Sequence, residues 1–264
     1  MRRLPLALGW AAAALMALAS AVGLLFPGVY HDPDWVLAAW FGNDLVTLVV
    51  AVPILVTGLI SARRGSRLGE LLVYASFAYA IYGYAYYLFG ASMNLLLPVY
   101  VAIVVVSLVG LAVGLGSLDA PSLAARFSPR TPKRFAAGYM VFVGVGLGMA
   151  WLAQWAAYVF GNTEPSVGVD AFATIAALDL SLIIPFMVLG GVLLWRGKPW
   201  GYVLGAIYTV KGASYTLALT LGSAAGAVRG VEGTLAQIPI WGAMSVLGAV
   251  AAFTLLRGLR RTAA

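Results

Sequence analysis

Long apolar runs separated by short polar segments fill almost the whole of this 264-residue chain. A helix that crosses a bilayer needs about 20 predominantly apolar residues. By that measure the pattern predicts eight membrane-spanning helices. They cover residues 4–26, 45–62, 68–89, 95–115, 135–160, 171–195, 200–221 and 235–256. We therefore expect an all-α polytopic membrane protein.

The sequence also matches itself at an offset of 132 residues, which is half its length. Residues 48–72 align with residues 180–204 without a gap, and eight of the 25 positions are identical, where so apolar a composition gives about one in ten by chance. The identities include a proline inside a predicted span, Pro53 and Pro185, which bends a helix. We infer an internal repeat in which both halves bend the same helix at the same place.

Each half of this repeat contains four predicted spans. Because four is an even number, the second half enters the membrane in the same orientation as the first, as a parallel tandem repeat. The two four-helix halves are residues 1–116 and 135–264, and a cytoplasmic linker with three prolines, residues 117–134, joins them. In membrane proteins built from repeats, the binding site tends to lie where the halves meet.

The charges place both termini on the cytoplasmic side of the plasma membrane. The chain is 62% hydrophobic and 9% charged, which excludes a soluble core, and its net charge is +7. Placing the N-terminus inside puts most cations on the cytoplasmic side, as the positive-inside rule requires. Because membrane topology explains these basic residues, we expect no nucleic-acid partner. These cations are Arg2, Arg3, Arg63, Arg64, Arg67, Arg126, Arg130, Lys133, Arg134, Arg196, Lys198, Arg257, Arg260 and Arg261. The first residues also have the features of a secretory signal, but the repeat requires them as a helix.

The absence of cysteine and the single histidine limit the chemistry. They exclude disulfides, thiolate zinc sites, iron–sulfur clusters and haem with two histidine ligands. His31 lies among carboxylates in an outer loop, where a solvated side chain is favoured over a metal ligand because zinc needs three or four ligands. We expect no metal and no cofactor.

Lys211 and Asp179 are the candidates for a functional site. Lys211 lies about 13 residues, or roughly 20 Å, from the turn at Lys198, which is too deep for its ammonium to reach the interface. Asp179 lies at a similar depth on the preceding helix. An isolated charge at the bilayer centre costs about 3 kcal/mol or more, so we predict that the two residues pair. The pair either only clamps two helices or, as we favour, binds an ion, a proton or a polar substrate.

The third predicted span is rich in tyrosine. Tyr79 and Tyr82 share one helical face at mid-depth, where they are suited to line a polar or cation-stabilising cavity beside the charged pair. Packing is the alternative, and the tyrosines nearer the outer end are typical of an interfacial aromatic belt. At the repeat offset Lys211 corresponds to Tyr79 and Asp179 to Thr47, so the predicted site is asymmetric.

Asp44 and Gln154 are two further candidates. Asp44 lies one turn closer to the outside than the counterpart of Asp179; it is either an outer gate or, as we favour, part of the N-cap of a span that starts at Leu45. Gln154 reaches the level of Asp179, where it either lines an outer vestibule or belongs to an interfacial anchor.

These candidates predict a small transporter or channel-like protein that binds and translocates a small polar solute or ion at a midplane site between its halves. Its partners are the bilayer, that small molecule or ion, and further copies of the chain if oligomerisation completes the path. Two alternatives stay open. One is an intramembrane enzyme acting on a lipid-like or isoprenoid substrate, with Asp179 as a base; the other is a structural subunit without chemistry.

Overall fold

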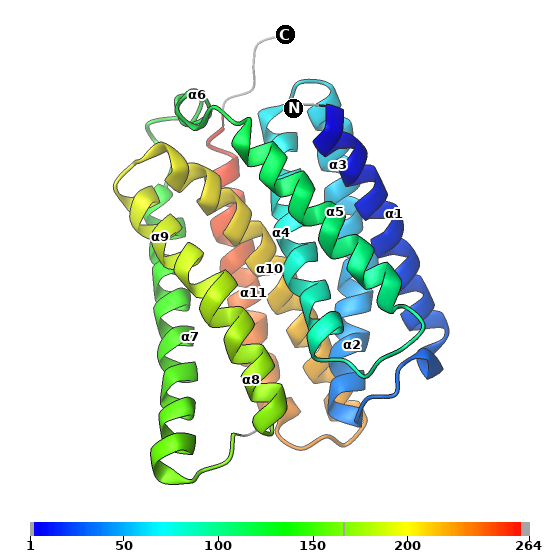
Figure 1. Cartoon of the computed structure of the whole chain (residues 1–264). Helices are drawn as coiled ribbons and strands as arrows, with labels where there is room; N and C mark the ends of the chain where they lie inside the picture. Colours follow the sequence, from blue (N-terminus) through cyan, green and yellow to red (C-terminus); the bar gives the residue numbers. More distant parts are fainter. Residues whose placement is uncertain (1–2, 166, 260–264) are drawn as a thin grey trace.

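The computed structural model describes residues 3–165 and 167–259, and this part of the chain is helical except for turns and one isolated bridge (Figure 1). Its elements in order are α1 (Arg3–Leu25), η1 (Pro27–Val29), α2 (Asp34–Val46), η2 (Thr47–Ala51), α3 (Val52–Arg63), α4 (Arg67–Phe89), α5 (Leu97–Gly116), α6 (Ala120–Ala124), α7 (Lys133–Gly161), α8 (Val169–Leu178), η3 (Asp179–Ile183), α9 (Ile184–Trp195), α10 (Pro199–Val228) and α11 (Thr234–Leu256). The cations Arg2, Arg260 and Arg261 lie outside the described residues.

Six helical segments of the described chain are long and apolar enough to cross a membrane. They are Arg3–Leu25, Asp34–Arg63, Leu97–Gly116, Lys133–Gly161, Val169–Trp195 and Thr234–Leu256. This confirms an all-helical, multi-pass membrane protein. The other two predicted spans form α4 and α10, whose tyrosine, serine, threonine and lysine side chains lower their mean hydropathy.

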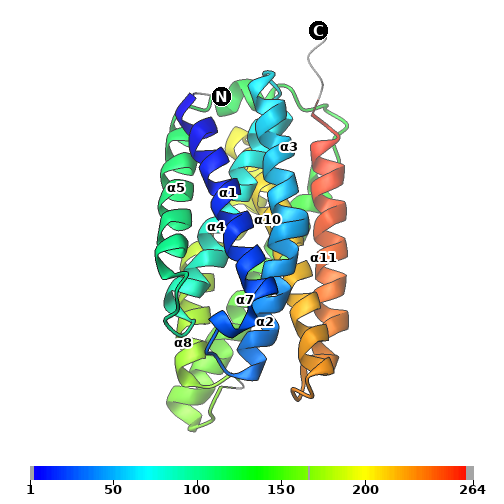
Figure 2. The same ribbon diagram turned by 90° about the vertical axis from the view of Figure 1, so that its right-hand side faces the viewer.

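Helices α4 and α10 run side by side through the middle of the bundle, and the other long helices surround them (Figures 1 and 2). Most residues of α4 are buried, including its tyrosines Tyr74, Tyr79, Tyr82, Tyr84 and Tyr87. The two least apolar long helices therefore turn their polar side chains toward the protein interior, and this is what creates a polar centre in an otherwise apolar bundle.

The second helical segment begins about three turns earlier than the predicted span. It starts at Asp34, directly after the extended Pro33, and continues through η2 to Arg63. An acidic residue in the first turn stabilises this start. Asp44 therefore lies inside the helix, and the interpretation of Asp44 as an N-cap residue is wrong.

Two segments of π-helix interrupt the long helices, and each is followed by a proline. They are η2 and η3, which begin 132 positions apart at Thr47 and Asp179; Pro53 and Pro185 come just after them. Proline cannot donate the backbone hydrogen bond of a regular helix, and a π-turn accommodates one extra residue. The extra residue changes the angular register between the two parts of each helix, and Asp179 is the first residue of the second such segment.

A tight helix crossing joins α2 to α10. A Cβ atom on Gly42 would overlap the carbonyl oxygen of Ala218 and the backbone nitrogen of Gly222. Only glycine lets the two backbones approach this closely. This contact holds the part of α10 that follows Lys211 against the N-terminal half of the chain.

The linker lies at the end of the bundle where α1 begins and α11 ends (Figure 1). It contains the short helix α6, and Phe127 forms an antiparallel bridge with Leu259. The linker is therefore tied to the end of α11.

Candidate functional site

Asp179 is buried, with 5% of its surface exposed, and it accepts hydrogen bonds from two aromatic side chains. The Tyr82 hydroxyl of α4 donates to Oδ1 at 2.5 Å, and the Trp151 indole N–H of α7 donates to Oδ2 at 2.9 Å. Hydrogen bonds to a charged acceptor are the stronger kind and compensate part of the cost of burial. One carboxyl group thus joins three helical segments, η3, α4 and α7.

Lys211 of α10 lies on the other side of Tyr82. Its Nζ atom is 3.6 Å from the centre of the Tyr82 ring and 4.8 Å from the centre of the Tyr215 ring, and the residue is 4% exposed. Both charged residues are in the described part of the chain, yet they form no direct ion pair there. The structure therefore corrects the predicted geometry: Tyr82 lies between the two groups, with its ring facing the ammonium and its hydroxyl bonded to the carboxylate.

Two further tyrosines complete the cluster. The Tyr82 ring meets Tyr86 and Tyr215 edge-on, at centroid distances of 5.5 and 4.7 Å. Edge-to-face packing leaves ring faces free for a cation. We call Asp179, Lys211, Tyr82, Tyr86, Tyr215 and Trp151 the midplane site. The sequence pattern missed Tyr215, although its position four residues after Lys211 places it on the same helical face.

Tyr79 and Gln154 lie outside this cluster. The Tyr79 hydroxyl is within 2.9 Å of the Thr47 hydroxyl, so these two residues pair with each other and not with the charged groups. Gln154 is partly exposed on α7, and Trp155 and Tyr158 beside it are exposed. No contact joins Gln154 to the midplane site in the described residues, whereas Trp151, one turn earlier, reaches Asp179.

Asp44 belongs to a second buried cluster. It is 2% exposed, and its two carboxylate oxygens accept hydrogen bonds from Tyr30 at 2.7 Å and from Tyr87 at 2.9 Å. Burial, together with the nearby Asp44, raises the pKa of the Tyr30 hydroxyl, which therefore stays protonated and donates. The carboxylate packs onto Gly23 of α1, where a Cβ atom would collide with it.

Aromatic rings surround Asp44. Trp40 stacks on Tyr87 with a centroid distance of 4.2 Å, and Tyr84 and Tyr100 pack against Tyr87 at 5.4 and 4.9 Å. We call Asp44, Tyr30, Trp40, Tyr84, Tyr87 and Tyr100 the outer cluster. Tyr84 and Tyr87 are only 2% and 4% exposed. Assigning the outer tyrosines of this span to an interfacial belt is therefore wrong for these two, which line the protein interior.

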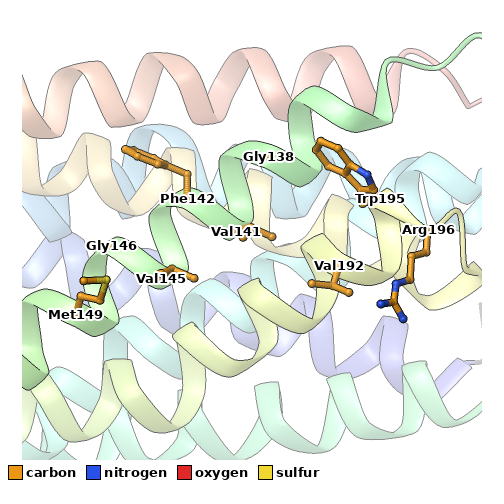
Figure 3. A pocket seen from close by; sticks show the side chains of 9 residues that line it. All are labelled: Gly138, Val141, Phe142, Val145, Gly146, Met149, Val192, Trp195 and Arg196. Carbon is orange, nitrogen blue, oxygen red and sulfur yellow. The ribbon is translucent and has the colours of Figure 1, made fainter.

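Apart from these clusters, an apolar groove of about 680 Å³ runs between α7 and α9 (Figure 3). Its walls are Gly138, Val141, Phe142, Val145, Gly146, Met149, Val192 and Trp195, and the Arg196 side chain lies at one end (Figure 3). None of the residues selected from the sequence as site candidates lines this groove.

No protein-family model, curated protein or solved structure matches the chain.

Proposed function

We propose that the protein binds and translocates a small polar solute or ion at the midplane site. The observation that carries this proposal is the position of Tyr82 between Lys211 and Asp179. Burying a cation and a carboxylate is costly, and an apolar contact would hold the helices together without that cost. Here the tyrosine ring faces stabilise the ammonium, and the hydroxyl of Tyr82 and the indole N–H of Trp151 stabilise the carboxylate. Because the two charged groups do not form a direct ion pair, both remain available to bind a solute or ion.

The arrangement of the halves supports the same proposal. The chain crosses the plasma membrane eight times, with both termini in the cytoplasm, as a parallel tandem repeat. In support, α4 and α10 are 23 and 30 residues long, enough to span a bilayer, and their polar residues are buried. The coincident offset of η2 and η3 favours the repeat. In this topology the first half contributes Tyr82 and Tyr86 to the midplane site. The second half contributes Trp151, Asp179, Lys211 and Tyr215.

The chemistry of the site suggests how a ligand is exchanged. A cation that reaches Asp179 competes with the Lys211 ammonium for the carboxylate and for the tyrosine faces. An anion competes with Asp179 for the same ammonium. Either event changes the attraction between α10 and the η3 segment, and the π-turn at η3 is a place where a helix can adjust without losing its backbone bonds.

Charge movement tests the proposal. Proteoliposomes on a solid-supported membrane are exposed to jumps in proton, sodium and potassium concentration. Wild-type protein is expected to displace charge in response to at least one of these ions, and Asp179→Asn to lose that response. The matched control Asp170→Asn, which changes an exposed acid at the start of α8, should keep it. Signals no larger than those of protein-free liposomes for all three ions would contradict ion translocation.

The groove between α7 and α9 supports one part of the enzyme alternative, the binding of a lipid-like molecule, although the proposed base Asp179 does not line it. It is apolar and ends at the Arg196 cation, as an acyl chain with an anionic head group requires (Figure 3). Val145→Trp would fill it. If this alternative holds, native mass spectrometry finds lipid retained by the wild type and lost from that variant.

A further inference from the structure

A second cavity lies at the outer end of the bundle, where α4 ends and α5 begins. Its volume is about 190 Å³, and its walls include Tyr87, Tyr100, Ser92, Met93 and Asn94. A water molecule takes up about 30 Å³ in the liquid, so this pocket has room for a small organic molecule.

One wall of this pocket carries an unpartnered polar group. The Tyr100 side chain is 1% exposed, and its hydroxyl makes no hydrogen bond of good geometry with the described residues, although the side chains of Tyr30 and Asn94 lie near it. Buried hydroxyl groups are nearly always hydrogen-bonded, so an orphan one next to a cavity indicates a partner supplied by a ligand or by water.

Two carboxylates lie directly behind the walls. Asp44 is held by the Tyr87 hydroxyl, and Asp32 accepts a hydrogen bond from the backbone N–H of Ser92 at 2.6 Å. In the described part of the chain, no lysine or arginine contacts either carboxylate. The pocket therefore combines aromatic walls with uncompensated acidic groups.

The midplane site contains the same combination together with a cation. There, the Tyr82 hydroxyl donates to Asp179 and the Tyr82 ring lies against the Lys211 ammonium. In the outer cluster, the Tyr87 hydroxyl donates to Asp44 in the same way, but none of the basic side chains that the structure describes reaches the ring. The outer arrangement thus lacks the ammonium group that the inner one provides for itself.

We propose that this pocket binds a small organic ammonium ion, with its charged group against Tyr87 and Tyr100 and with Asp44 and Asp32 as the nearby counter-charges. Ring faces favour a weakly hydrated ammonium, especially a methylated one. Metal ions such as calcium need six to eight oxygen ligands, which these aromatic and apolar walls do not provide. This site is separate from the midplane site, and it is inferred independently of translocation.

Choline is a suitable probe because it has an uncharged carbon isostere, 3,3-dimethylbutan-1-ol. Isothermal titration of the purified full-length protein in detergent is expected to detect choline binding, with the isostere at least about tenfold weaker because it cannot interact electrostatically with the rings and carboxylates. Asp44→Asn and Tyr87→Leu should each weaken choline binding by about tenfold or more. Two controls should bind choline as the wild type does. Asp34→Asn changes an exposed acid at the same end of the bundle. Tyr74→Phe removes a hydroxyl elsewhere on α4, which donates to the carbonyl oxygen of Gly114 on α5.

Three results would overturn the proposal. They are a folded wild type that binds no choline, equal affinity for choline and the isostere, or an Asp34→Asn variant that loses as much affinity as Asp44→Asn. If Asp44→Asn does not fold, the comparison of choline with its isostere on the wild type still decides the question.

Discussion

The ammonium of Lys211 lies 3.6 Å from the centre of the Tyr82 ring, in the interior of the bundle, and forms no direct ion pair with the residues that the structure describes. The same tyrosine donates its hydroxyl to Asp179. A single side chain from α4 thus connects a cation on α10 with a carboxylate on η3, and its two functions can be separated by mutation.

Replacing Tyr82 in two ways measures these functions. Tyr82→Phe keeps the ring beside Lys211 and removes the hydrogen bond to Asp179, which is expected to cost about 1.5–3 kcal/mol because the acceptor is charged. Tyr82→Leu removes both, and should cost about 2 kcal/mol more. Thermal unfolding in detergent gives the two values. Equal losses for Phe and Leu would show that the ring contributes nothing to holding Lys211.

The crossing of α2 and α10 is expected to tolerate no side chain. Gly42→Ala places a Cβ atom against the backbone of α10, and overpacking of this kind costs about 1–3 kcal/mol, or a drop of several degrees in the unfolding temperature. Gly83→Ala is the control, since a Cβ atom there meets no atom within 4 Å. It should be neutral or stabilising by up to about 1 kcal/mol. Equal effects of the two variants would contradict the close packing.

The number of spans can be counted with single cysteines, because the chain has none of its own. If α4 crosses the membrane, Ser92→Cys reacts with an impermeant maleimide added to intact cells, and Ser122→Cys reacts only after permeabilisation. If only the six most apolar segments cross, the two results are exchanged. Both serines are exposed on the protein surface, so a difference in labelling reports the side of the membrane and not burial within the protein.

The apolar pattern was sufficient to predict the helices but not all of their ends. The span predicted from Leu45 begins at Asp34, because a window of apolar residues excludes Asn43 and Asp44 even though both are buried inside the helix. Hydropathy reports the average polarity of a segment, whereas the burial of Asp44 depends on donors from Tyr30 and Tyr87, which are far from it in sequence.

Only part of the midplane site could be predicted from the sequence. Lys211 and Asp179 stood out because charges are rare in apolar runs, and their depth followed from helix geometry. The position of Tyr82 between them depends on how α4 and α10 pack against η3, and Asp179 itself begins a π-turn. Neither the interhelical packing nor that turn has a periodic signal in a single sequence.

Lys211→Met tests most directly whether the midplane site is a working site or only a helix clamp. Methionine has a similar shape without the charge, and Thr209→Val, at a fully buried residue on the same helix, is the matched control. Thermal unfolding and ion-driven charge displacement are measured on the same preparations. We predict that Lys211→Met, which leaves the buried Asp179 without a nearby cation, still folds with a loss of about 3 kcal/mol of stability but displaces no charge, while Thr209→Val retains both properties. A Lys211→Met protein that is strongly destabilised and still displaces charge as the wild type does would contradict the proposed site.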